Sequence, residues 1–176
     1  MAIIQGDVIG GSAGFYPKEI EQSLRFNDDD SAYLSWTPAS AGNRKTWTWS
    51  GWVKRGNLAT STLFSANGTE VPFIRFNSDK FEFYCYQGAV NKFVRTSAVY
   101  RDTSAWYHLV VSLDVTQATA SDRVKLYVNG NQITALDVAD YPNQNADLPI
   151  NSAAEHRLGS WYTYPSGVYL DGYLAE

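Results

Sequence analysis

WYHLVVSLDVTQATASDRVKLYVNGNQI, residues 106–133, is the stretch that decides the fold. In its first part every second residue from Tyr107 to Leu113 is apolar or aromatic, which is the period of a β-strand with one buried face. A second alternating run, 123–128, leads into Asn129 and Gly130. Asn-Gly between two such runs favours a tight hairpin because both residues tolerate a positive φ. The stretch therefore predicts adjacent antiparallel strands.

The same period of two recurs along the chain from Ser23 onward. It predicts short strands at 23–26, 32–35, 47–54, 62–65, 73–76, 80–86, 106–114, 123–128, 132–135, 156–159 and 169–175. No long window has the spacing of an amphipathic helix. About ten short strands separated by turn signals indicate an all-β fold built as a two-sheet antiparallel sandwich.

Composition limits the classes of function. The chain has 176 residues, of which 44% are hydrophobic and 15% aromatic, enough apolar surface to order one domain. The net charge is −4 and the basic residues are scattered, so nucleic acid is not an expected partner. No apolar run reaches the length of a membrane span.

The start of the chain differs from the rest. Residues 1–22 are a weakly apolar stretch interrupted by glycines and Pro17, which predicts an arm or docking segment, with a disordered terminus as the alternative. Residues 23–176 are expected to form the sandwich. The first residues lack the basic region of a signal peptide, and Cys85 is the single cysteine. We therefore expect a protein made in a reducing cytosol.

Four segments in order carry a resemblance to a known family: SLRFNDDDSAYLS (23–35), WTWSGWVKR (47–55), residues 106–133, and HRLGSWYTYPSGVYLDGYLAE (156–176). Together they resemble laminin-G-like, concanavalin-A-like domains. SAGNRKTWTWSGWVKR (40–55) is most similar to such domains in structural and tail-fibre proteins of tailed bacteriophages. The resemblance implies a jelly roll that binds glycans or proteins, in some members with calcium at one end.

The resemblance also implies a role. It suggests a non-catalytic virion component, of tail-fibre or capsid-decoration type, made in the host cytoplasm and displayed outside the cell after lysis. Its expected partners are other virion proteins and a host-surface glycan, with oligomers in the assembly. Because the family usually continues its last strand beyond the position of Glu176, we also expect a longer polypeptide or a strand donated by a neighbour.

The enzymatic alternative is a polysaccharide-acting glycoside hydrolase, because the same sandwich carries glucanases. Hydrolysis needs two carboxyl groups on either side of the scissile bond. The Glu-x-Asp-x-x-Glu run of the related glucanases is absent, Glu19 and Glu21 lie in the arm, and Glu82 stands alone between aromatic residues. The sequence therefore favours a protein that is not an enzyme.

Three further reactive side chains are interpreted as structural. His108 lies in an apolar strand and His156 begins a late one, and no Gly-x-Ser-x-Gly motif supplies a nucleophile for either. Cys85 alternates with Phe81 and Phe83, which is typical of a small residue in the core.

Asn27, Asp28, Asp29 and Asp30 form the densest acidic run. Calcium prefers hard oxygen ligands, so this turn is chemically suitable for it, and Asp171 in the closing Asp-Gly is a candidate further ligand. The alternative is a solvated turn whose carboxylates cap backbone amides, which we favour because other ligands would have to converge from distant loops.

The loop at 160–168 is rich in aromatic residues. Exposed rings at the end of a sandwich can stack on sugars or anchor a protein partner, and the alternative is that they cover the core. The candidate binding residues are Trp161, Tyr162 and Tyr164, with Tyr169 just beyond, and a second candidate loop contains Tyr141 and Asn143.

Overall fold

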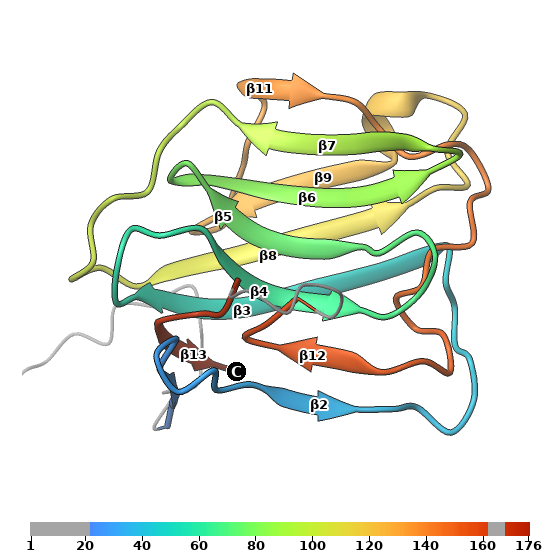
Figure 1. The fold of residues 1–176 in the computed structure, drawn as a ribbon. Coiled ribbons are helices and arrows are strands. Elements are labelled where there is room, and N and C mark those ends of the chain that lie inside the picture. The colour runs from blue at the N-terminus through green and yellow to red at the C-terminus, as the bar shows by residue number, and fades with distance from the viewer. Residues whose placement is uncertain (1–21, 162–167) are drawn as a thin grey trace, which may run out of the picture.

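The computed structural model describes residues 22–161 and 168–176, which form two facing β-sheets (Figure 1). A single short 3₁₀ turn, η1, is the helical element of this part of the chain. The elements are β1 (Leu24–Phe26), β2 (Leu34–Trp36), β3 (Thr46–Arg55), β4 (Ser61–Ala66), β5 (Phe73–Asn77), β6 (Lys80–Gln87), β7 (Val90–Thr96), β8 (Tyr107–Asp114), η1 (Ala120–Asp122), β9 (Val124–Val128), β10 (Asn131–Gln132), β11 (Leu136–Ala139), β12 (His156–Leu158) and β13 (Gly172–Ala175).

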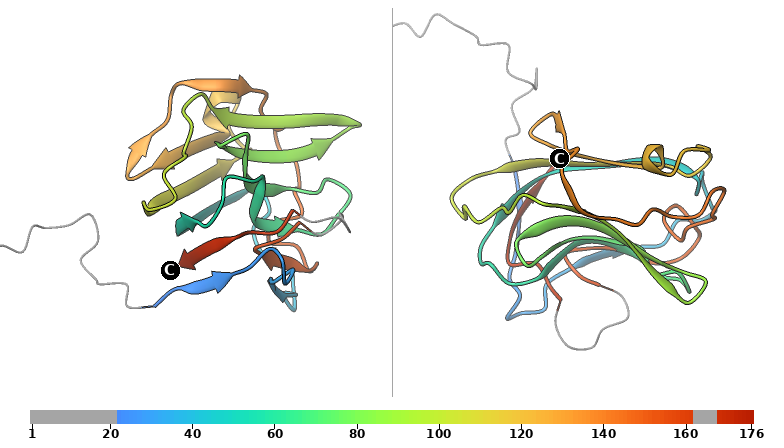
Figure 2. Two further views of the ribbon diagram at one scale, coloured as in Figure 1. Left: turned by 60° about the vertical axis from the view of Figure 1, so that its left-hand side comes forward. Right: turned by 90° about the horizontal axis from the view of Figure 1, so that it is seen from above.

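The two sheets contain six and seven strands, and neighbouring strands are antiparallel. The six-stranded sheet has the order β1-β13-β3-β8-β9-β10, and the seven-stranded sheet has the order β11-β7-β6-β5-β4-β12-β2. Figure 2 shows the sheets face to face, as a sandwich requires. The predicted all-β, antiparallel two-sheet jelly-roll sandwich is confirmed. In the described ranges no helix is long and apolar enough to cross a membrane.

Alternation along the strands builds the core between the sheets. In β8 the predicted face is buried, since Leu109, Val111 and Leu113 are at most 1% exposed. In β6 the side chains of Phe81 and Phe83 point into the same core. The single cysteine, Cys85, lies beside them, and burial raises the pKa of its thiol to about 12, as expected for an inert core residue.

Tight turns set the register of two hairpins. Asn129 and Gly130, predicted as a turn, both have positive φ (51° and 79°), as a type I′ turn requires. The predicted turn after β5 has the same geometry at Ser78 and Asp79, with φ of 50° and 63°. A one-residue slip would turn each buried face outward, so these turns fix the faces that the core needs.

Two strands were missed by the sequence interpretation. β7 lacks a continuous apolar face, because the core residue Val94 shares its side of the strand with Lys92 and Thr96; the strand is held by six paired positions with β6. β11 has four residues and a register irregularity against β7. β2 begins at Leu34, two residues later than predicted, because its pairing partner is the three-residue strand β12. In such short elements pairing outweighs the local pattern.

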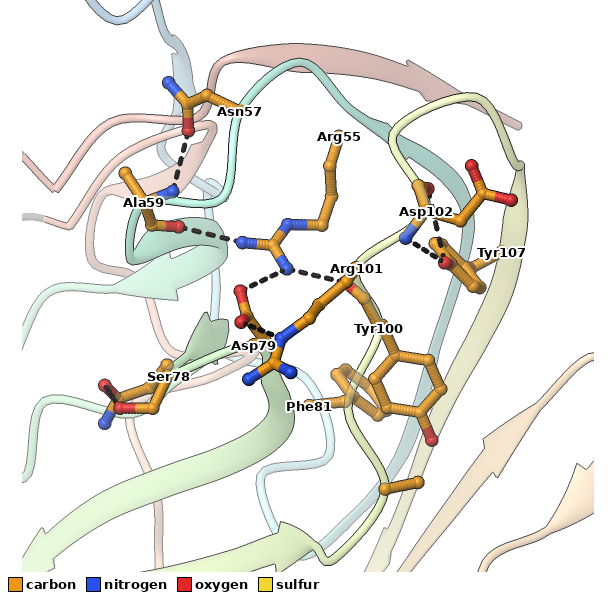
Figure 3. A network of polar contacts seen from close by, with 12 residues as sticks. Arg55, Asn57, Ala59, Ser78, Asp79, Phe81, Tyr100, Arg101, Asp102 and Tyr107 are labelled. Carbon is orange, nitrogen blue, oxygen red and sulfur yellow. Dashed lines mark hydrogen bonds and ion pairs between the residues drawn. The ribbon is translucent and has the colours of Figure 1, made fainter.

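One end of the sandwich, at the left of Figure 1, is closed around a buried arginine. Arg55, 1% exposed, donates from Nη1 to Asp79 Oδ1 (3.1 Å) and to the Tyr100 carbonyl (2.7 Å), and from Nη2 to the Ala59 carbonyl (3.1 Å) (Figure 3). Arg101 Nε donates to the other oxygen of Asp79 at 2.7 Å. The hydrogen bonds from Arg101 and Arg55 hold the pKa of Asp79 below its usual value. We call this the arginine end.

Candidate functional site

The predicted aromatic loop is only partly within the described residues, since Tyr162 and Tyr164 lie outside them. Trp161 is partly buried, and its ring centroid is 4.8 Å from that of Phe73. Tyr169 lies instead near Tyr33, with ring centroids 6.5 Å apart. The structure thus gives Trp161 and Tyr169 separate neighbours rather than one shared platform. Their role in binding stays a prediction.

Trp161 marks an aromatic cluster on the outer face of the seven-stranded sheet. Phe73 lies outside the core cluster, although the next residue, Ile74, belongs to it, so Phe73 points away from the core. The Phe73 ring stacks on Tyr84 with centroids 4.2 Å apart and planes 14° apart. Tyr86 lies two residues further along β6 on the same face, and it is 37% exposed. The cluster therefore ends in an accessible aromatic ring.

Tyr86 also lines a cavity of about 620 Å³ at the end of the sandwich opposite the arginine end. Three loops converge there, the one after β4, the one after β6 and the one before β12, together with Arg44, which precedes β3. The lining residues are Arg44, Asn67, Gly68, Thr69, Glu70, Tyr86, Gly88, Ala89, Asp147, Pro149, Ser152 and Ala154. The volume falls within the usual range of small-ligand sites. We call this cavity the end pocket; β4 and β6, whose following residues line it, end at the right of Figure 1.

The segments around the end pocket are locked to one another. A Cβ built on Gly68 would lie 2.7 Å from Pro149 Cγ, so the two loops touch at a place where only glycine fits. The Asn67 amide donates to the Glu155 carbonyl at 2.8 Å. The Tyr86 amide donates to the Glu70 carbonyl, also at 2.8 Å. The pocket is therefore preformed, because its walls are fixed by backbone contacts.

Arg44 fixes the third wall. Its Nε donates to the Leu148 carbonyl at 2.7 Å, and its Nη2 donates to the Asp147 carbonyl. Lys45 Nζ lies 3.8 Å from the Asp147 carboxylate. These contacts span about a hundred residues of sequence, and so they bring the loop before β12 to the start of β3.

Glu70 is the residue of the end pocket whose hydrogen bonds are incomplete. Within the described residues its Oε2 is buried and has no hydrogen-bond partner. Burial raises the pKa of the Glu70 carboxyl, Arg44 acts against that shift, and Asp147 adds to it. A buried carboxylate oxygen without a donor is costly, so it is poised to accept a hydrogen bond from a bound molecule.

The second predicted loop lies beside the end pocket but does not line it. The Asn143 amide donates to Gln87 Oε1 at 2.8 Å, next to Gly88 of the pocket. Tyr141 packs against the core, and burial raises the pKa of its hydroxyl. Arg123 Nη1 holds the loop through the Pro142 carbonyl at 3.0 Å. Here the structure supports a packing role for Tyr141.

The predicted calcium residues lie at the arginine end. Asp28 Oδ2 accepts a hydrogen bond from Asn57 Nδ2 at 3.0 Å, and Asp30 Oδ2 accepts one from Asn27 Nδ2 at 2.6 Å. Asp29 is exposed, and the Asp171 carboxylate lies against Gly56. No group of three or more acidic, histidine or cysteine side chains suited to a metal occurs in the described ranges. Calcium binding therefore stays an expectation from the family resemblance.

Glu82, the isolated candidate acid of the hydrolase alternative, is held between two arginines. It is 0% exposed, one oxygen is bound by Arg75 Nε, and the other lies 3.5 Å from Arg95 Nη1. Arg95 Nη2 in turn contacts Asp137 at 2.8 Å. A glycoside hydrolase needs a pair of carboxyl groups at the scissile bond, and the groups that contact the two oxygens of Glu82 are arginines instead.

The two histidines have structural surroundings. His156 Nε2 accepts the Asn151 amide at 3.0 Å, so its proton resides on Nδ1, which lies 2.8 Å from the Ala154 carbonyl. Burial lowers the pKa of His156. The ring also stacks on Trp36, with centroids 5.3 Å apart. His108 is buried beside Trp52, and burial lowers its pKa as well.

Sequence reasoning missed Arg44, Glu70 and Tyr86. One signal was available: the alternation in β6 that puts Glu82 and Tyr86 on the face away from the core. Nothing in the local sequence shows that the loop after β4 meets the loop before β12, because that contact depends on the sheet order.

Two facing antiparallel sheets of six and seven strands define the class of concanavalin A-like β-sandwiches. The chain belongs to the concanavalin A-like lectin/glucanases superfamily, since the superfamily's laminin G model matches residues 28–176. No curated protein sequence matches the chain.

Solved structures of low sequence identity share the fold. The LG1-3 region of the laminin alpha2 chain has a TM-score of 0.64 at 11% identity, covering 89% of this chain and 30% of that one. Domains LG4-5 of the mouse laminin alpha1 chain have a TM-score of 0.62 at 9% identity, covering 99% of this chain and 45% of that one. The native heptameric SAP-like pentraxin from Limulus polyphemus has a TM-score of 0.55 at 14% identity, covering 82% of this chain and 67% of that one. The chain thus spans about two thirds of that pentraxin chain and less than half of either laminin chain.

Proposed function

We propose that this chain is a non-catalytic recognition module that binds a glycan in the end pocket. One observation carries the proposal: the exposed ring of Tyr86 and the unpartnered oxygen of Glu70 line the same preformed cavity. The superfamily's description, which names lectins, supports it.

The chemistry of the pocket suits a sugar. A pyranose has an apolar C–H face and a rim of hydroxyl groups, so it needs a flat apolar surface and several fixed polar groups. Tyr86 offers the surface, and Glu70 and Asn67 offer polar groups on the facing loop. A largely preformed pocket loses little conformational entropy on binding.

The absence of catalysis is part of the proposal. Its support is the arrangement around Glu82, where arginines rather than a second carboxyl group lie against the two carboxylate oxygens. Release of reducing sugar from a glucan and galactan panel, abolished by Glu82→Gln, would contradict it.

The binding test uses two aromatic residues of equal exposure. Tyr86→Ala should abolish retardation of the protein in affinity gels that contain the recognised polysaccharide. Trp106→Ala is the matched control, because Trp106 is 38% exposed compared with 37% for Tyr86 and directly precedes β8 at the arginine end. Equal losses in both variants would contradict a site at the end pocket.

We further propose that the module belongs to a virion, where it is displayed to the host surface alongside other virion proteins. The support is the resemblance of residues 40–55 to tailed-phage structural proteins, together with a single, buried cysteine. Mass spectrometry of purified particles should find the protein. Its absence from particles made by cells that express it would refute the virion role and leave glycan binding untouched.

A further inference from the structure

We infer that Glu70 makes the end pocket selective for uncharged sugar units and excludes sugar acids. The inference rests on the glycan-binding function proposed above and deepens it by naming the class of ligand and the residue that selects it.

The backbone position of Glu70 is fixed by contacts of its loop. Its own carbonyl accepts the Tyr86 amide at 2.8 Å, and the next residue, Val71, has a φ of 25°, an unusual value for a β-branched residue. Two residues earlier Gly68 lies against Pro149. A loop held at both sides keeps the backbone of Glu70 at the pocket, because moving it away would break these contacts.

With Lys45 counted beside Asp147, the positive and negative charges at the end pocket balance, but they are not equally engaged. Arg44 uses Nε and Nη2 on the carbonyl groups of Leu148 and Asp147. Lys45 lies 3.8 Å from the Asp147 carboxylate. Among the carboxylate oxygens that line the pocket, Glu70 Oε2 is buried and has no hydrogen-bond partner in the described part of the chain. The group waiting for a ligand is therefore an acceptor.

An acceptor at this place discriminates between ligands. A sugar hydroxyl can donate a hydrogen bond to Glu70 and relieve its buried oxygen. A uronic acid would bring a second carboxylate to the same place, and like charges at short range repel strongly where water is excluded. An amino sugar carrying a positive charge would meet Arg44. The uncharged sugar is the ligand that both charged side chains, Glu70 and Arg44, tolerate.

The experiment compares matched polysaccharides. Galactan and polygalacturonate form one pair, mannan and polymannuronate a second, each tested by affinity electrophoresis and titration calorimetry at pH 8, which keeps carboxyl groups ionised. We expect the unmodified chain to bind the neutral member of at least one pair and not its acidic partner. Glu70→Gln should weaken the affinity for the neutral polysaccharide about tenfold or more. It should also reduce the difference in affinity between the neutral polysaccharide and its acidic counterpart.

Two variants guard the interpretation. Glu70→Asp keeps the charge and should keep the exclusion of sugar acids even where affinity falls. Asp29→Asn removes one negative charge at the arginine end and should change neither property, because Asp29 is exposed there.

The outcomes separate the inference from the function beneath it. Equal binding of a neutral polymer and its acidic partner, or an unchanged preference in Glu70→Gln, would overturn the role of Glu70 and leave glycan binding in place. Failure to bind any polymer of the panel would overturn the proposed function itself.

Discussion

The two ends of the sandwich are built from similar residues and differ in which buried polar atom is left without a hydrogen-bond partner among the described residues: a donor, Arg55 Nε, at the arginine end, and an acceptor, Glu70 Oε2, at the pocket end. At the arginine end Arg55 is buried, and its two terminal nitrogens donate to Asp79 and to two carbonyl groups. At the opposite end Arg44 donates to two carbonyl groups, but Glu70 keeps a buried oxygen without a partner.

This difference indicates how one fold separates stability from recognition. The arginine end joins the last residue of β3 to the turn between β5 and β6, and a ligand there would compete with the protein's own hydrogen bonds. The pocket end has equally fixed loops and spare hydrogen-bonding capacity. The following changes test whether the two ends differ in this way.

Arg55→Met has the largest expected effect. The change leaves the Tyr100 and Ala59 carbonyl groups without their donor and the Asp79 carboxylate without its buried partner, so we expect the free energy of unfolding to fall by about 3–5 kcal/mol. Urea unfolding followed by tryptophan fluorescence measures it.

The control for Arg55 is Arg101→Met. Arg101 contacts the same carboxylate but is 63% exposed, so its loss should cost no more than about 1 kcal/mol. Comparable losses in the two variants would mean that Asp79, rather than the buried arginine, stabilises this end.

Gly68→Ala tests the walls of the end pocket. The new Cβ would lie 2.7 Å from Pro149, so the two loops must separate, at an expected cost of about 1–3 kcal/mol and with loss of glycan affinity. Gly88→Ala is the matched control, because Gly88 also lines the pocket yet its Cβ would meet nothing within 4 Å. At φ +56° it should cost about 1 kcal/mol and leave affinity unchanged. A loss of glycan affinity in Gly88→Ala, with affinity retained in Gly68→Ala, would contradict a preformed pocket.

Acid should loosen the pocket end before the arginine end. The pKa of His156 is lowered in the fold, so the unfolded chain takes up the proton more readily, and stability falls as the pH drops below the ordinary histidine value. Protonation of His156 would place a second donor, Nε2–H, against the backbone N–H of Asn151. The carbonyl of Asn151 accepts a hydrogen bond from the Gly42 amide, so Gly42 should be affected as well. Asp79 has a lowered pKa, so its contribution persists until the pH falls below the ordinary aspartate range.

Hydrogen exchange, corrected for intrinsic rates, measures this order. Between pH 7.5 and pH 5 the amides of Gly42 and Asn151 should lose protection, with a change of about 1 kcal/mol, while the Tyr100 amide, which donates to the Asp79 carbonyl, should not. Equal loss at Tyr100 would show that acid opens both ends together. His156→Gln should remove most of the pH dependence at Asn151.

Strong alternation made most of the fold predictable from the sequence. The runs around Leu109 and Phe83 and the Asn129–Gly130 turn specify strands, faces and one hairpin locally, and the structure confirms them. β7 escaped prediction because it is fixed by pairing with β6 rather than by its own apolar pattern.

The end pocket could not be predicted for a related reason. Arg44 and Leu148 are joined by one hydrogen bond across 104 positions of sequence, a contact that only the strand order creates. The sequence did mark the adjoining loop of Tyr141 and Asn143, which the structure places beside the pocket through Gln87. Aromatic composition thus pointed to a loop that lies beside the end pocket, whereas the lining residues depended on topology, and a binding role for either stays a prediction.

The smallest expected effect concerns Glu70 and stability. Its pKa is raised in the fold, so it favours the folded state most at low pH, and that contribution is lost as the pH rises through the folded pKa. At neutral pH the buried carboxylate is therefore a cost to the fold, and Glu70→Gln should leave the free energy of unfolding unchanged or raise it by up to about 0.5 kcal/mol. Urea unfolding at pH 7.5 and pH 4.5 measures the change, and the gain should vanish at the lower pH. A substantial loss of stability at pH 7.5 would mean that Glu70, like Arg55, is a structural group, and that the end pocket has no carboxylate to spare for a ligand.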